Sequence, residues 1–388
     1  MNSRLIILVT IVFAQFCCTS LWFATNAIIN DLISHFGLQE SALGQLTSAV
    51  QFGFIVGTLF FGILSIADKF SPSKVFLVCA LGGALINALI IYKGNTIASL
   101  LAIRFIVGFF LAGIYPVGMK IASDYYKKGL GVSLGYLVGA LVLGTALPHA
   151  IKAFGGALSW NMVIIVVSGI AIIGGFCIYF LVPDGPYRKK GSGWKLKNVT
   201  SLIKNKEFVT ASIGYFGHMW ELYAFWAFVP LAIELTLDSS SNHSLFAFCV
   251  IAIGSLGCIA AGYLSKRYGV ERMAFLFLFI SFCCCLLSPI ILNSQHKSGI
   301  FLFLLIWGFT VVADSPLFST SVANSSPAEV KGGALTIVTC LGFLISIVSI
   351  QLLNNIRDNV AVEWLFIYLC IGPAIALAVY LWKRKRSY

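Results

Sequence analysis

Charged residues are scarce in this chain of 388 residues: they make up 10% of it, against about 25% in a typical soluble domain. Hydrophobic residues account for 59% of the chain. A water-soluble fold of this length could not bury so much apolar surface. The composition therefore argues against a soluble enzyme, a nucleic-acid-binding protein and a disordered protein, and it indicates a polytopic membrane protein.

Paired cysteines and metal-binding clusters are also missing. All eleven cysteines lie in apolar stretches, and none is in a loop where an extracellular disulfide framework would form. The sequence contains no C-x-x-C pair, no His/Cys cluster with zinc spacing, no H-E-x-x-H and no phosphate-binding P-loop. We therefore expect no resident metal, no cofactor and no catalytic residue, and we do not expect an enzyme.

Long apolar runs dominate the sequence instead. A membrane-spanning helix needs about 20 mainly apolar residues, and the chain holds twelve such runs. They cover approximately residues 5–29, 42–66, 74–92, 96–121, 131–154, 160–182, 207–236, 244–265, 273–293, 299–322, 332–353 and 362–382. Most of the loops are short, so neighbouring helices must run antiparallel. The predicted fold class is an all-α polytopic membrane protein with twelve transmembrane helices.

One connection is longer than the others. Residues 183–206 begin with Pro183-Asp184-Gly185-Pro186 and continue as a basic stretch. We predict that this segment is a cytoplasmic linker. It would join an N-terminal six-helix bundle, residues 1–182, to a C-terminal six-helix bundle, residues 207–388.

The distribution of Lys and Arg predicts the orientation, because these residues accumulate on the cytoplasmic side of a membrane. With a cytoplasmic N-terminus, 21 of the 26 basic residues fall on the inner side, four fall on the outer side, and Arg104 lies inside a span. The net charge of +12 therefore reflects orientation and needs no nucleic-acid partner. We expect both termini in the cytoplasm and the chain in a bacterial inner membrane.

An internal repeat relates the two halves at a constant offset of 200 residues. Gly108-Phe109 and Tyr115-Pro116 correspond to Gly308-Phe309 and Ser315-Pro316. The same offset relates Gly62-Ile63-Leu64-Ser65 to Gly262-Tyr263-Leu264-Ser265. Matches at equivalent topological positions favour two homologous bundles, related by a pseudo-two-fold axis along the membrane normal.

These features resemble the major facilitator superfamily of transporters. The family's motif after helix 2, roughly G-x-L-A-D-R-x-G-R-R, is similar to Gly262-Tyr263-Leu264-Ser265-Lys266-Arg267-Tyr268-Gly269, with Lys266 where Asp is usual. The first copy, Asp68-Lys69-Phe70 and then Lys74, is looser, with Gly62 two residues too far upstream. Arg104-x-x-x-Gly108 resembles the family's R-x-x-x-G element. The resemblance implies two pseudo-symmetric bundles and a small-molecule substrate.

The loop motif predicts a gate. Asp68, Lys69 and Arg267 would lie at cytoplasmic helix ends, where a carboxylate can pair with a basic group or a helix N-terminus of the opposing half. Such a pair would hold one conformation closed and would break in the other. A solvated charged turn is the alternative.

Ionisable residues inside spans are costly and usually mark a transport pathway. Arg104, Glu221 and Asp314 lie in helices 4, 7 and 10, which in the superfamily line the central cavity together with helix 1. His218 and Glu221 are three residues apart and share a helix face, so we expect them to hold or pass a proton together. A satisfied interhelical hydrogen bond is the alternative for each acid. Arg104 would bind an anionic group or neutralise a carboxylate.

Polar and aromatic residues on the same helices are candidates for the cavity wall. They are Trp22, Asn26, Tyr115, Trp220 and Tyr223. Contact with lipid or with the membrane interface is the alternative for each aromatic residue.

Two family signatures are absent. Gly139 is followed by Ala140, so the Gly-Pro dipeptide of proton antiporters is missing from helix 5. Helices 7 and 10 loosely resemble nitrate/nitrite-type permeases. In nitrate porters, arginines in helices 2 and 8 bind the anion, and the corresponding residues 42–66 and 244–265 of this chain contain no arginine.

We therefore predict a monomeric secondary transporter that moves a small solute by alternating access, coupled to protons by Glu221 and Asp314. Its other partner would be the lipid bilayer. Efflux of amphipathic compounds, by antiport or uncoupled, is the alternative.

Overall fold

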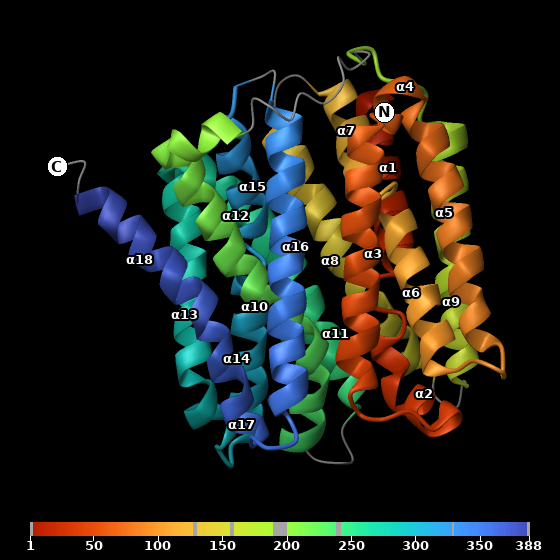
Figure 1. Cartoon of the computed structure of the whole chain (residues 1–388), viewed down its shortest axis with the longest axis vertical. Helices are drawn as coiled ribbons and strands as arrows, with labels where there is room; N and C mark the ends of the chain where they lie inside the picture. The colour runs from red at the N-terminus through yellow and green to blue at the C-terminus, as the bar shows by residue number, and fades with distance from the viewer. Residues whose placement is uncertain are drawn as a thin grey trace. The chain divides into compact units, whose positions relative to one another are not determined.

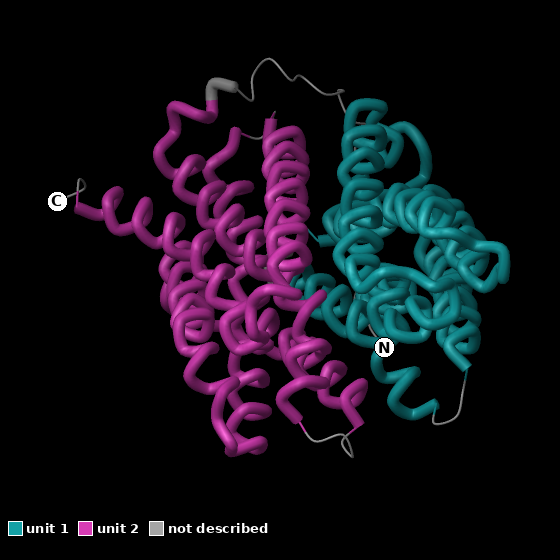
Figure 2. The backbone as a smooth tube through the Cα atoms, turned by 60° about the horizontal axis from the view of Figure 1, so that its bottom comes forward, with its two compact units in different colours: residues 1–193 teal, residues 194–388 magenta. Residues whose placement is uncertain are grey.

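The computed structural model describes residues 3–126, 130–155, 159–188, 200–237, 242–327 and 330–385. These residues form helices and turns and contain no β-strand. The chain divides into two compact units, residues 1–193 and 194–388 (Figure 2). The expected linker, residues 183–206, remains a prediction, because residues 189–199 lie outside the described part.

The described residues of the first unit form six membrane-crossing segments. Several of these segments are built from two consecutive helices (Figure 1). Its elements are α1 (Ser3–Thr19), η1 (Asn26–Ile28), α2 (Ile29–Phe36), α3 (Ala42–Ile63), α4 (Ile66–Lys69), α5 (Pro72–Ala88), η2 (Leu89–Ile91), α6 (Ile97–Leu111), α7 (Tyr115–Tyr125), α8 (Leu130–Phe154) and α9 (Trp160–Leu181).

The second unit repeats this plan. Its elements are η4 (Thr200–Lys204), α10 (Lys206–Thr236), α11 (His243–Ala252), α12 (Gly254–Tyr268), α13 (Val270–Leu292), α14 (Lys297–Thr310), α15 (Ser315–Asn324), α16 (Lys331–Ile356), α17 (Val362–Leu365), η5 (Phe366–Cys370) and α18 (Ile371–Lys385). The fold class predicted from the sequence, an all-α polytopic membrane protein with two pseudo-symmetric bundles, is confirmed.

Ten helices in the described ranges are long and apolar enough to cross a membrane. The remaining two segments occupy the first position in each unit. Helix α1 is apolar but short, because it ends at Thr19. Helix α10 has 31 residues, but His218 and Glu221 lower its apolar character.

Helix ends follow local sequence signals. Thr96 caps α6 through a capping box with Ser99. The Asn205 side chain accepts hydrogen bonds from the first backbone N–H groups of α10. Pro116 and Pro316 stand in the first turns of α7 and α15, where a missing N–H costs nothing. The prolines therefore explain why two spans restart after a break at residues 112–114 and 311–314.

Two glycine contacts repeat at the offset of 200 residues. A Cβ atom on Gly108 would lie 1.9 Å from the Val50 carbonyl oxygen, and one on Gly308 would lie 1.9 Å from the Val250 carbonyl oxygen. Only glycine permits so close an approach of two helix backbones. The sequence repeat therefore corresponds to the same helix crossing in both units, α3 with α6 and α11 with α14.

The ends of the second spans break this symmetry. In the first unit, α3 ends at Ile63 and the chain turns at Ser65, whose φ is 50°. In the second unit, α12 continues to Tyr268 and the chain turns at Gly269, whose φ is 89°. The turn thus comes four residues earlier in the first unit, which explains why its copy of the loop motif is the looser one.

Candidate functional site

Glu221 lies in the middle of α10 and is 1% exposed. Its Oε1 accepts hydrogen bonds from Trp307 Nε1 at 2.6 Å, from the Ser281 hydroxyl, and from Cys285 Sγ at 3.4 Å. These donors come from α13 and α14, so the carboxylate joins three helices inside the second unit. The Trp307 ring also packs on Phe225, with ring centroids 4.7 Å apart.

His218 lies one turn before Glu221 on α10 and pairs with Asp314. Its Nδ1 is 2.7 Å from Asp314 Oδ1, and both side chains are almost fully buried. Asp314 stands just before α15, at the end of the break that begins after α14. The break therefore places the carboxylate inside the bundle, at the start of a helix, where negative charge is favoured.

The pairing differs from the one expected from the sequence. His218 and Glu221 share a helix face, but the described contacts place His218 on Asp314 and Glu221 on Trp307 and Ser281. Spacing along one helix indicates which side chains face the same way. The hydrogen-bond or ion-pair partner of each side chain depends on the neighbouring helices. His218 Nε2 has no hydrogen-bond partner among the described residues, so this nitrogen offers a position for a proton or a ligand.

Arg104 is completely buried in the first unit. Its Nη1 donates to the Leu21 carbonyl at 2.9 Å, and its Nη2 donates to the Trp22 carbonyl. Nη1 also lies 3.5 Å from Asn87 Oδ1. Residues 20–25, between α1 and η1, form turns. Two carbonyls of this segment accept from backbone N–H groups that follow them, whereas the Leu21 and Trp22 carbonyls accept from a side chain. Arg104 supplies those donors and pairs with no carboxylate in the described ranges.

The expected wall residues have varied environments. Trp22 is fully buried against Phe54, with ring centroids 4.8 Å apart. Asn26 donates to Thr47 Oγ1 at 2.9 Å. Tyr115 is half-buried in the first turn of α7. These three belong to the first unit, and their place in a cavity wall remains a prediction.

The two expected wall residues of the second unit face other helices. Trp220 is half-buried, and its Nε1 donates to the Tyr368 carbonyl at 3.1 Å, in the last span. Tyr223 is 4% exposed and packs on Trp226 and Phe343. Both contacts lie within the second unit.

One of the three expected gate residues, Asp68, is paired within its own unit. Asp68 forms an ion pair with Lys120 at 2.9 Å, and Lys120 lies 3.6 Å from Asp124. Arg188 donates to the Phe70 carbonyl at 2.7 Å and pairs with Asp184. The loop after α3 is thereby fastened to α7 and to the chain that follows α9.

The other two gate residues are exposed. Lys69 forms no ion pair with any residue that the structure describes. Arg267 lies over the ring of Tyr268, 5.3 Å from its centroid. A pairing of the gate residues with the opposing half stays a prediction.

Sequence reasoning did not find the partners that hold the buried charges. Ser281 and Cys285 look like ordinary residues of apolar helices, and Asn87 is a single amide in an apolar span. Trp307 is noticeable as a tryptophan of the tenth span, but the sequence does not indicate that it donates to Glu221. In the sequence, Lys120 lies near a helix end, and this position alone accounts for a lysine there without an ion pair. Only the helix arrangement shows which of these side chains reach a charge.

One uncharged side chain on α1 is buried without a partner. Gln15 is fully buried, and neither atom of its amide group has a hydrogen-bond partner in the described part of the chain. Its Oε1 would lie 2.4 Å from a Cβ atom on Gly118. A glycine in α7 therefore leaves the room that this amide occupies.

Metal and hydrolase chemistry find no support in the part of the chain that the structure describes. Its residues contain no group of three or more His, Cys, Asp or Glu side chains that could hold a metal ion. The G-x-S-x-G spacing of residues 131–135, typical of a hydrolase nucleophile elbow, lies within the continuous helix α8. Ser133 is therefore not on the strand-to-helix turn that this chemistry needs.

Comparison with known proteins identifies a family. Residues 11–350 match the model of the Major Facilitator Superfamily. The chain is 27% identical over 241 residues to the multi-drug resistance efflux pump PmrA homolog of Lactococcus lactis, covering 59% of this chain and 58% of that protein. The chain thus spans less than two thirds of that relative.

Two further relatives match over longer stretches. The probable sulfoacetate transporter SauU of Cupriavidus necator is 23% identical over 316 residues, covering 73% of this chain and 71% of that protein. The bicyclomycin resistance protein homolog of Haemophilus influenzae is 21% identical over 359 residues, covering 88% of this chain and 85% of that protein.

Proposed function

This chain belongs to the Major Facilitator Superfamily, and on that premise we propose that it is a proton-coupled secondary transporter of a small solute. Its relatives include transporters and efflux pumps. The observation that carries the proposal is the buried His218–Asp314 pair beside Glu221. Three ionisable side chains in one bundle are costly to keep in a membrane.

Proton binding at these groups would change how the helices hold together. A proton on Asp314 would weaken its attraction to His218, and a proton on Glu221 would weaken the hydrogen bonds from Trp307 and Ser281. Together these contacts link α10 to α13, to α14 and to its continuation, α15. Protonation can therefore bias the packing of these helices, which is what coupling to a conformational change requires.

We propose that the first unit contributes polar contacts to the solute. The Gln15 amide and the Arg104 Nε are buried without a hydrogen-bond partner in the described part of the chain. A carboxylate or sulfonate would suit them, because both groups can donate hydrogen bonds. The sulfoacetate named for the Cupriavidus relative and the niacin named for an Acinetobacter baylyi relative, 30% identical over 171 residues, are organic anions of this kind.

The proposal also includes the membrane location and the oligomeric state of the chain. We infer that the chain is a monomer in a bacterial inner membrane with both termini in the cytoplasm. The excess of basic residues on one set of loops supports this orientation. Six of these residues, Lys127, Lys128, Lys189, Lys190, Lys195 and Lys197, lie outside the described ranges.

The coupling test compares two kinds of flux in proteoliposomes. A screen of sulfoacetate and nicotinate by thermal stabilisation would first supply a ligand. Glu221→Gln should then keep counterflow exchange within about twofold but reduce accumulation driven by a pH gradient at least tenfold, because exchange needs no net proton movement. Glu234→Gln, an exposed residue of the same helix, is the matched control. Accumulation by Glu221→Gln equal to the wild type would contradict the coupling role.

Efflux of amphipathic compounds is the second candidate. Two relatives carry names of drug efflux or resistance, and the Trp307 indole, which packs on Phe225, donates to Glu221. If efflux is the function, a strain lacking the protein should become sensitive to such compounds, and expression should restore resistance only with an acidic residue at position 221. Unchanged sensitivity together with solute-dependent uptake would favour import.

A further inference from the structure

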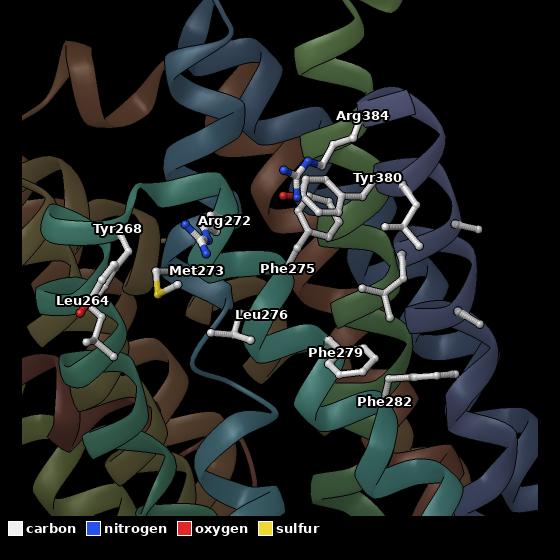
Figure 3. Close-up of a pocket in the computed structure, with 14 residues that line it drawn as sticks. Leu264, Tyr268, Arg272, Met273, Phe275, Leu276, Phe279, Phe282, Tyr380 and Arg384 are labelled. Carbon is white, nitrogen blue, oxygen red and sulfur yellow. The ribbon is translucent and has the colours of Figure 1, made fainter. Parts of the chain in front are cut away.

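A pocket opens on the surface of the second unit, between α12, α13 and α18, and has a volume of about 800 Å³ (Figure 3). Leu264, Leu276, Phe279 and Leu381 line it and are 40–59% exposed. The wall is therefore apolar and open to the surface of a helix bundle that spans a membrane.

The floor of the pocket is aromatic and tightly packed. The rings of Phe275 and Tyr380 stack with centroids 4.0 Å apart and an interplanar angle of 12°. Phe275 is 2% exposed. This stack holds α13 and α18 together at one end of the pocket, while the end of α18 leans away from α13 beyond it (Figure 1).

The charges of the pocket are confined to one end. Arg272, on the first turn of α13, and Arg384, on the last turn of α18, lie at the same end, with Phe279 and Phe282 further along the wall (Figure 3). Arg384 lies 5.9 Å from the centroid of the Tyr380 ring. The nearby Glu271 pairs with Lys383 at 2.7 Å. Counted together with Arg272 and Arg384, the formal charges at this end of the pocket are net positive.

The length of the pocket matches one leaflet. From Arg272 to Phe282 along α13, and from Ala374 to Arg384 along α18, the wall extends about 15 Å at 1.5 Å per residue. The hydrocarbon core of a bilayer is about 30 Å thick. A groove that starts at the helix ends and extends about 15 Å therefore fits a single acyl chain of one leaflet, with its headgroup at the arginines.

We propose that this pocket is a binding site for an anionic phospholipid. The phosphate lies between Arg272 and Arg384, whose planar guanidinium groups form paired hydrogen bonds with phosphate oxygens. An acyl chain lies along Leu276, Phe279 and Ala378. Basic pockets between transmembrane helices recognise lipid headgroups in this way.

The test measures lipid retention on the full-length protein by native mass spectrometry, with phosphatidylglycerol and phosphatidylcholine of identical acyl chains. The wild type should retain phosphatidylglycerol at least fivefold more than phosphatidylcholine. The double variant Arg272→Gln/Arg384→Gln should lose this preference. Lys266→Gln/Arg267→Gln removes two exposed basic residues near the same end but outside the pocket, and should keep it within twofold.

Further variants separate the headgroup from the chain. Arg272→Lys/Arg384→Lys keeps the charge and should retain part of the preference. That result would also show that replacing both arginines does not by itself unfold the protein. Ala378→Trp fills the groove and should reduce the retention of both lipids. Millimolar inorganic phosphate should not displace the bound lipid.

Four results would overturn the proposal. One is equal retention of the two lipids by the wild type, and another is an equal loss in the two double variants. The third is displacement of the lipid by inorganic phosphate, which would indicate a site for a soluble anion. A dimer that Ala378→Trp dissociates would assign the groove to a second copy of the chain and would overturn the lipid site as well.

Discussion

The first and seventh spans occupy equivalent positions in the two units, but each interacts with a buried charge in a different way. In the first unit, Arg104 donates to the carbonyls of Leu21 and Trp22, where the span is unwound. In the second unit, α10 is continuous, and Glu221, at the position equivalent to Leu21, accepts from Trp307. The first span is stabilised by a cation that donates hydrogen bonds to its backbone carbonyls. The seventh span is stabilised by donors that form hydrogen bonds with its buried carboxylate.

The difference follows from the backbone. A continuous helix satisfies its own carbonyls, so the side chains of α10 are available for other contacts. An unwound segment leaves carbonyls that must find donors when they are buried. Arg104 stands at the position of Leu304, and Ile114 at the position of Asp314. The same architecture therefore carries a structural cation in one half and titratable anions in the other.

The largest expected effect is the loss of the Arg104 contacts. Arg104→Leu introduces leucine, the residue that the second unit has at the equivalent position 304. The Leu21 and Trp22 carbonyls then lose the N–H donors of the guanidinium group. We expect a loss of about 2–5 kcal/mol in the free energy of unfolding, because each buried unsatisfied group costs about 1–3 kcal/mol. Unfolding in detergent measures it, with the exposed Arg267→Leu as control. An equal stability of the two variants would show that the carbonyls do not depend on Arg104.

The glycine crossings test how far the two units remain alike. Gly108→Ala and Gly308→Ala each place a Cβ atom 1.9 Å from a carbonyl oxygen of the facing helix. We expect both variants to lose about 1–3 kcal/mol, since overpacking forces backbone shifts. Gly332→Ala, where no atom lies within 4 Å, should not destabilise. A large cost in only one unit would mean that the crossing is not equivalent in the two halves.

The hydrogen bond of Trp307 to Glu221 should have a smaller effect. Trp307→Phe keeps an aromatic ring against Phe225 and removes the N–H donor, while Ser281 still donates to the carboxylate. We expect a loss of about 1–2 kcal/mol and a changed pH dependence of transport. Trp364→Phe, at a residue 57% exposed, should change neither. Wild-type stability and pH dependence in Trp307→Phe would argue against a role for this bond.

The smallest expected effect concerns the ion pair after α3. Asp68 and Lys120 are 33% and 22% exposed at their side chains, so solvent screens the pair. Asp68→Asn should cost only about 0.2–1 kcal/mol of stability. Asp358→Asn, whose carboxylate is 73% exposed, is the control. If Asp68→Asn lowers transport far more than stability, the gating role predicted from the motif gains support; unchanged transport would remove it.

Much of the fold could be predicted from the sequence because its signals are local. Apolar runs mark the spans, and Pro116 and Pro316 mark the restarts of two of them. The offset of 200 residues marks the repeat, which the contacts of Gly108 and Gly308 reproduce. The break at residues 20–25 has no such signal, since no proline or glycine stands there.

The candidate site could be predicted only in part. Arg104, Glu221 and Asp314 are conspicuous because charges are rare within apolar helices, and that rarity is visible in the sequence. Their partners are not visible, since Ser281 and the Leu21 carbonyl carry no distinguishing pattern, and a tryptophan at position 307 does not by itself indicate a bond to Glu221. The expected His218–Glu221 contact rests on spacing within one helix, whereas the closer partner of His218 comes from the break after α14.

The sequence by itself determined the helical class, the number of spans, their repeat and the identity of the buried charges, because hydropathy and repetition are properties of the chain alone. The tertiary structure decided which helix faces which, and with it whether a buried charge meets a carboxylate, an indole or a backbone carbonyl. A membrane excludes water from these sites, so each buried charge must find its partner within the protein. Helix packing therefore determines the partner of each charge.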